Sequence, residues 1–93
     1  MAAEIRRARS EGVRVLKVIH GYGSSGRGGA LCAGLRKSLS LRRKEGLIRD
    51  FIPGEEFSIF QQRTLELLAA VPVLRGDADL ENVNEGVTLV WIQ

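Results

Sequence analysis

The sequence predicts an α/β fold, a two-layer sandwich in which helices pack on a mixed β-sheet built around a βαβ unit. Three observations support this prediction. Short segments dominated by β-branched and apolar residues predict strands at residues 13–20, 47–52 and 86–92. Longer segments with apolar residues at helical spacing separate them, at residues 29–44 and 57–71. The length of 93 residues, with 44% hydrophobic and 27% charged side chains, suits one small domain over residues 1–93.

The first half of the chain predicts a helix, a strand and a second helix. Residues 1–10 favour a helix with a weak apolar stripe between arginines, and Gly12 ends it. Residues 13–20 (VRVLKVIH) are apolar on both faces, which predicts a strand buried on much of its surface. After a glycine-rich loop, Leu31, Leu35 and Leu39 recur every four residues. This spacing predicts an amphipathic helix over residues 29–44, and Gly46 follows its end.

The second half begins with the next expected strand, residues 47–52 (LIRDFI), which Pro53 and Gly54 stop. Strand, helix and strand at this length predict a right-handed βαβ crossover with parallel strands. A helix over residues 57–71 and a polar, acidic surface loop over residues 72–85 are expected next. Residues 86–92 (GVTLVWI) are apolar on both faces apart from one threonine, which predicts a central strand covered on both sides.

Charge is divided unevenly along the chain, although the net charge is only +3. Residues 1–49 hold 12 Lys/Arg and 3 Asp/Glu, a balance of +9, whereas residues 50–93 hold 2 Lys/Arg and 8 Asp/Glu, a balance of −6. Such asymmetry indicates a polyanionic partner, and the alternative is a pair of solvated faces of opposite sign. The choice depends on whether folding keeps the two charges apart.

Composition also excludes several classes of site. A single cysteine, Cys32, allows no internal disulfide, and with the single histidine, His20, it cannot complete a zinc site. We therefore expect no metal and no cofactor. No apolar run approaches the length of a membrane span, and residues 1–12 lack an apolar signal core. The sequence favours a cytoplasmic protein without a membrane partner.

The most informative segment is residues 20–31 (HGYGSSGRGGAL), with five glycines among the nine residues 21–29. It matches G-x-G-x-x-G between a strand and a helix, where backbone N–H groups bind phosphate. The chain is too short for a full dinucleotide fold. The nucleotide-hydrolase pattern fails because Arg27 and Gly28 stand where it needs Lys and Ser or Thr. A phosphate of a larger ligand and a merely flexible connection remain as interpretations.

The string VRVLKVIHGYGSSGRGGAL, followed by a helix and by GVTLV near the C-terminus, resembles the small MutS-related (Smr) domain family. Members carry an H-G-x-G signature after their second strand, matched here by His20-Gly21-Tyr22-Gly23, and a closing G-V-T-V-type strand, matched at residues 86–90. The resemblance implies a fold akin to the C-terminal domain of a bacterial translation initiation factor, binding to DNA or RNA and, in several members, cleavage. It also implies that the family's first strand, with its L-D-x-H signature, is missing from this chain.

We therefore expect an Smr-type domain that binds DNA or RNA and holds backbone phosphate at the glycine loop. One alternative is an endonuclease whose L-D-x-H strand lies outside this chain, with His20 as the catalytic candidate. For that role His20 has no second histidine and no carboxylate among residues 12–44 to orient it. Another alternative is a protein interaction module, including a homodimer, that pairs through the edge of strand 13–20. The residues expected to bind nucleic acid are His20, Gly21, Tyr22, Gly23, Ser24, Ser25, Gly26, Arg27, Arg36 and Lys37.

Overall fold

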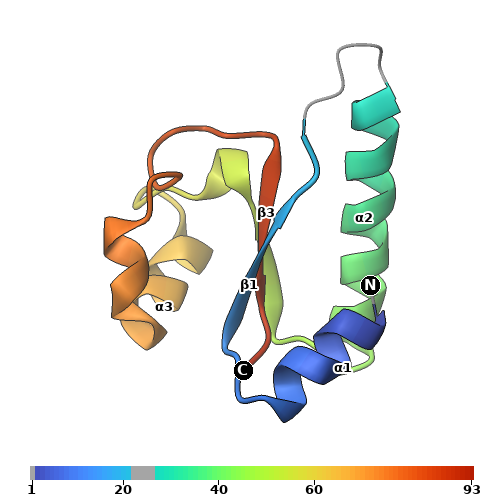
Figure 1. Ribbon diagram of the computed structural model, residues 1–93. Coiled ribbons are helices and arrows are strands. Elements are labelled where there is room, and N and C mark those ends of the chain that lie inside the picture. The colour runs from blue at the N-terminus through green and yellow to red at the C-terminus, as the bar shows by residue number, and fades with distance from the viewer. Residues whose placement is uncertain (1, 22–26) are drawn as a thin grey trace.

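A computed structural model describes residues 2–21 and 27–93, with side chains at residues 3–21 and 33–93 (Figure 1). The helices and strands are α1 (Ala2–Ser10), β1 (Val15–Ile19), α2 (Arg27–Lys44), β2 (Asp50–Pro53), α3 (Gln62–Ala70) and β3 (Val87–Trp91). Two short 3₁₀ helices, η1 (Gly54–Glu56) and η2 (Pro72–Gly76), flank α3. The α/β class and each expected helix and strand are confirmed, with shifted ends.

The largest shift concerns α3, which was expected to begin at residue 57. Phe57 is instead buried at the end of η1, where its N–H donates to the carbonyl of Gly54 at 3.2 Å. Glu81 accepts hydrogen bonds from the Ser58 hydroxyl and the Ile59 N–H, so this segment is held in turns against a distant loop. Tertiary contacts therefore delay a helix that apolar spacing alone would start earlier.

The strands form one sheet in the order β1-β3-β2. β1 pairs with β3 from Val15↔Trp91 to Ile19↔Val87, and β2 pairs with β3 from Asp50↔Trp91 to Pro53↔Thr88. Both pairings are antiparallel, so the mixed sheet expected from the sequence is not formed. β1 and β2 do run in the same direction, as a βαβ unit requires, but β3 lies between them and takes the hydrogen bonds that they were expected to share.

Helices cover both faces of this sheet, which corrects the expected two-layer sandwich to three layers (Figure 1). On one face α1 and α2 pack over Val90 and Ile92. On the other face α3 and η2 pack over Leu89 and Trp91. Alternate residues of one strand thus enter two separate cores. The prediction of a central strand covered on both sides, with Trp91 buried, is confirmed. Covers on both sides of a sheet make three layers, which differs from the two-layer sandwich that was also expected.

The α1 and α2 layer is fixed at its lower end in Figure 1, where the C-terminus of α2 meets α1. Ile5 and Leu39 are fully buried between the two helices and the sheet. The guanidinium of Arg9 donates to the carbonyls of Gly46 and Leu47, both at 2.8 Å, just beyond the end of α2. A cation at these carbonyls also stabilises the negative end of the helix dipole. None of the helices in the described ranges is long and apolar enough to cross a membrane.

Gly54 is the position where the backbone passes closest to a neighbouring segment. A Cβ at Gly54 would overlap the carbonyl oxygen of Asn84 and would lie 2.6 Å from Cγ2 of Val87. We expect Gly54→Ala to lower the free energy of unfolding by about 1–3 kcal/mol, because the start of β3 must move aside. Urea unfolding followed by the fluorescence of Trp91, the only tryptophan, measures this loss.

The matched control is Gly34→Ala, since Gly34 is exposed on α2 and a Cβ there meets nothing within 4 Å. This change should leave stability unchanged or raise it by up to about 1 kcal/mol through helix propensity. Equal stability of both variants would contradict the close approach at Gly54.

Candidate functional site

The glycine loop starts at the edge of the sheet where β1 ends and β3 begins. The N–H groups of His20 and Gly21 both donate to the carbonyl of Gly86 at 2.9 Å. Gly21 has a φ of +75°, a conformation that glycine adopts without strain. The entry to the loop is therefore pinned to the first residues of the last strand. Five of the predicted binding residues lie outside the described residues: Tyr22, Gly23, Ser24, Ser25 and Gly26.

The imidazole of His20 has a partner at each ring nitrogen. Nδ1 lies 3.1 Å from the carbonyl oxygen of Gly21, and Nε2 lies 3.1 Å from the hydroxyl oxygen of Thr88. Because a carbonyl only accepts, Nδ1 carries the hydrogen, and the fully buried Thr88 hydroxyl donates to Nε2 of the neutral ring. His20 thus anchors the loop in this arrangement, and a phosphate or water would have to replace one of these bonds.

Glu55 brings a carboxylate to the same end of the sheet. Arg36 on α2 holds it with two parallel hydrogen bonds, from Nη1 to Oε2 at 2.7 Å and from Nη2 to Oε1 at 2.6 Å. Burial acts to raise the pKa of Glu55, but the hydrogen bonds from Arg36, a backbone hydrogen bond and the charge of Arg36 together lower it, and a protonated His20 adds to the lowering. The guanidinium of Arg36, which was expected to contact phosphate, therefore binds a carboxylate of this same chain.

Sequence reasoning missed both Thr88 and Glu55 as neighbours of His20. Thr88 is 68 residues from His20 along the chain, and Arg36 and Glu55 are 19 apart. One signal was visible, since Thr88 is the single polar residue in the apolar segment of residues 86–92. A lone hydroxyl in a buried strand needs a hydrogen-bond partner, and the only histidine is a suitable one.

Two other predicted residues belong to α2. Arg27 is its first residue, and the side chain of Arg27 is outside the described set. Lys37 is exposed on the helix, and no ion pair is found for it among the described side chains. The first turn of α2 contains no acidic residue, so nothing acidic there offsets the positive end of its dipole.

The segments that cover the two faces of the sheet differ in charge. α1 and α2 carry nine Lys/Arg and one acidic residue, Glu4, on one face. The opposite layer, residues 62–85, carries two arginines and five acids, namely Arg63, Arg75, Glu66, Asp77, Asp79, Glu81 and Glu85. Figure 1 shows α1 and α2 on one side of the strands and α3 on the other. The helices on the two faces therefore differ in charge, although ion pairs join the two halves of the chain, namely Lys17 with Asp77 and Asp79, Arg36 with Glu55, and Arg43 with Asp50.

A second group of charges lies at the other end of the sheet, where β2 starts. Asp50 accepts from Arg43 at 2.8 Å and from Arg63 at 2.7 Å, and both guanidiniums lie over the ring of Phe51. A depression of about 600 Å³ opens beside it, lined by Arg49, Asp50, Glu66, Ala69, Ala70 and Trp91. The ring of Phe51 and the carboxylate of Asp50 hold the two guanidiniums in place. No feature of this depression indicates a particular ligand.

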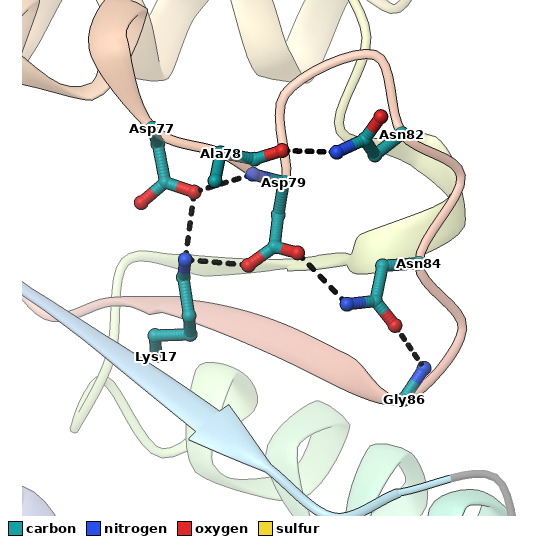
Figure 2. A network of polar contacts seen from close by, with 7 residues as sticks. All are labelled: Lys17, Asp77, Ala78, Asp79, Asn82, Asn84 and Gly86. Carbon is teal, nitrogen blue, oxygen red and sulfur yellow. Dashed lines mark hydrogen bonds and ion pairs between the residues drawn. The ribbon is translucent and has the colours of Figure 1, made fainter.

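The acidic loop before β3 is tied to β1 by Lys17 (Figure 2). The ammonium of Lys17 donates to Asp77 and to Asp79, both at 2.6 Å. Asp79 also accepts from the amide of Asn84 at 2.8 Å, and the oxygen of that amide accepts from the N–H of Gly86 at 2.9 Å. This chain of bonds positions Gly86, the residue to which the glycine loop is pinned.

Within the ranges that the structure describes, no cluster of His, Cys, Asp and Glu side chains could hold a metal ion. Comparison of the chain with protein-family models, with curated proteins and with solved structures gave no match.

The contact between Thr88 and His20 leads to a test of the ring's role. Thr88→Val removes the donor to Nε2, and we expect a loss of about 1 kcal/mol in the free energy of unfolding. In the unaltered protein, long-range ¹H–¹⁵N spectra of the imidazole should show the hydrogen on Nδ1 of the neutral ring. Thr64→Val is the control for the loss of a buried hydroxyl. Thr64 is equally buried, but it bonds to Glu56 and Ser58 and not to the imidazole. A hydrogen on Nε2 would refute the proposed arrangement.

The Lys17 network predicts a dependence of stability on pH. Hydrogen bonds from Lys17 and Asn84 lower the pKa of Asp79 from 3.8. Burial acts to lower the pKa of Lys17, but its bonds to Asp77 and Asp79 outweigh this and raise it from 10.5. The contribution of Asp79 is therefore complete above pH 3.8 and lost as the pH falls through its lowered pKa. That of Lys17 is complete below pH 10.5 and lost as the pH rises through its raised pKa.

We expect Lys17→Met to cost about 1–3 kcal/mol of unfolding free energy at neutral pH, because two carboxylates lose a charged donor. The difference from the unaltered protein should shrink in acid, below pH 3.8, in urea unfolding measured across pH. Lys37→Met removes the same charge from an exposed site and should show little difference at any pH. A pH-independent penalty for Lys17→Met would show that packing, and not the ion pairs, explains it.

Proposed function

We propose that this domain binds the phosphate backbone of a nucleic acid on the layer formed by α1 and α2. The observation that supports the proposal most strongly is the separation of charge by the sheet. Helices α1 and α2 hold nine basic residues and one acidic residue. Four of the nine are ion-paired, namely Arg7, Arg36, Arg42 and Arg43. The exposed Arg6, Lys37 and Lys44 form a positive surface that attracts a polyanion. The acidic layer on the far side orients the molecule, because it repels the same ligand.

The outer face of α2 supplies the first contacts. Leu39 points into the core, so Lys37 and Lys44, which are exposed, lie on the outward side and are seven residues apart, about two turns. Arg6 extends the same charge to the exposed side of α1, next to Arg7, which is paired with Glu11. Side chains with this spacing suit contacts with successive phosphates, which bind any sequence.

The N-terminus of α2 supports a further phosphate contact. The helix begins at Arg27, directly after the glycine-rich segment, and its first turn has no acidic residue. Free N–H groups and the positive end of the dipole favour an anion at such a point. The strand end that carries His20 and Gly21 leads into this segment. In this proposal His20 positions the loop by its bonds to Gly21 and Thr88.

Binding is better supported than cleavage. General base catalysis needs a ring nitrogen that can accept a proton from water, and both nitrogens of His20 are engaged within the fold. The carboxylate of Glu55, which lies at the same end of the sheet as His20, is held by two hydrogen bonds from Arg36. We therefore propose a binding domain and assign no hydrolytic step.

Charge reversal on the two layers tests the proposal. Lys37→Glu should weaken binding of fluorescently labelled single-stranded and duplex oligonucleotides severalfold, because a phosphate contact is lost. The slope of log affinity against log salt concentration should fall by about 1. Fluorescence anisotropy titrations over a series of salt concentrations measure both quantities.

Arg75→Glu provides the matched control. Arg75 is exposed on η2 in the acidic layer, and its reversal changes the net charge by the same amount. Affinity should change much less than for Lys37→Glu. Equal losses in the two variants would show that only net charge matters, and affinity that does not fall with added salt would refute phosphate binding.

A further inference from the structure

The two edges of the sheet differ in how they are protected against pairing with another chain. β2 is a strand of four residues that ends in Pro53, which has no N–H, and starts at Asp50, which holds two arginines. Short length, proline and fixed charge are the usual means by which edges are blocked. β1 has five residues, VLKVI, and no proline, and its one charge, Lys17, is drawn to Asp77 and Asp79. Its burial is also incomplete, in contrast to the fully buried β3.

The register shows which backbone groups β1 offers. The N–H of His20 donates to Gly86, and the N–H of Ile92 donates to Arg14, so the even-numbered residues of β1 bond to β3. Hydrogen-bonded and non-hydrogen-bonded pairs alternate in an antiparallel ladder. The N–H and C=O groups of Val15, Lys17 and Ile19 therefore point away from β3, along the open edge.

We infer that this edge is a dimer interface in which β1 of one protomer pairs antiparallel with β1 of its partner. Lys17 lies on the two-fold axis, and Val15 of each protomer lies opposite the partner's Ile19. The outward backbone groups of the two strands then satisfy one another, and the two sheets become one continuous sheet. This inference concerns a different surface from the proposed nucleic-acid contacts and does not rest on them.

Side chains make the edge complementary to itself. Ile19 is 78% exposed, and pairing would cover it with the partner's Val15. Lys17 would normally block an edge, but its ammonium is drawn to Asp77 and Asp79 and is held there at 2.6 Å. The strand therefore presents no unpaired charge to β1 of the partner.

Charge at the two ends of the strand favours the same antiparallel register. Arg14 precedes β1, whereas the other end lies beside Gly86, which Glu85 precedes. An antiparallel pair sets the basic end of each strand against the acidic end of its partner. A parallel pair would place like charges together.

The blocked edge at β2 limits the assembly to two chains. A two-fold contact uses the same surface on both protomers and closes on itself. Further strands would have to add at β2, where Pro53 and the Asp50 charge pairs oppose pairing. The expected product is a dimer and not a fibre.

Sedimentation velocity of the whole chain across the micromolar to millimolar range tests the inference. The unaltered protein should shift from monomer to dimer, and Ile19→Lys should weaken the dimer by about tenfold or more, since two cross-strand pairs are lost. Val73→Lys is the matched control, because Val73 is 81% exposed but lies on η2 and not on the β1 edge. This variant should dimerise as the unaltered protein does. Thermal unfolding of both variants verifies that each is folded.

Amide hydrogen exchange followed by NMR locates the interface. As concentration rises, exchange of the N–H groups of Val15, Lys17 and Ile19 should slow, while that of the exposed residues of η2 stays the same. A chain that remains monomeric at all concentrations overturns the inference. So does a dimer that leaves these three amides unprotected, or one that Ile19→Lys and Val73→Lys weaken equally.

Discussion

The whole structure depends on β3, a strand that is buried on both faces and paired on both edges. Val90 and Ile92 face the α1 and α2 layer, and Leu89 and Trp91 face the α3 layer. Burying these side chains, at roughly 25 cal/mol per Å² of apolar surface, requires two separate covers. The two neighbouring strands have no other strand to pair with in this sheet. The side strands complete both cores, since Phe51 of β2 joins Val90 on one face and Ile52 of β2 joins Leu89 on the other.

That arrangement also explains why the charges stay apart. Because β3 takes covers on both sides, the first two helices pack on one face and the third on the other. The basic and acidic segments of the chain are consequently separated by the thickness of the sheet. Among the described residues, ion pairs join the two segments at Arg36 with Glu55, at Arg43 with Asp50, and at Lys17 with Asp77 and Asp79. An electrostatic difference along the sequence becomes a difference between two faces, a form in which it can orient a charged ligand.

The elements of the fold were predictable from the sequence, and their arrangement was only partly so. Residues 13–20 and 86–92 are apolar on both faces, and this pattern correctly predicted two strands and the burial of Trp91. The pattern states which side chains are buried but not which strands are neighbours, so β3 was not placed between β1 and β2. His20 was recognised as special from its position before the glycines. Its partners Thr88 and Glu55 could not be found, because only the folded sheet brings them near.

The position of β3 in the chain has a consequence for biosynthesis. Residues 87–91 are the last strand to leave the ribosome, yet both other strands hydrogen-bond to this one. During translation α1 and α2 can form as local helices, but β1 and β2 must wait without partners until β3 emerges. The apolar edge of β1 therefore stays exposed in the nascent chain until β3 emerges. This interval is when a chaperone, or the same strand on a neighbouring nascent chain, has its best opportunity to bind.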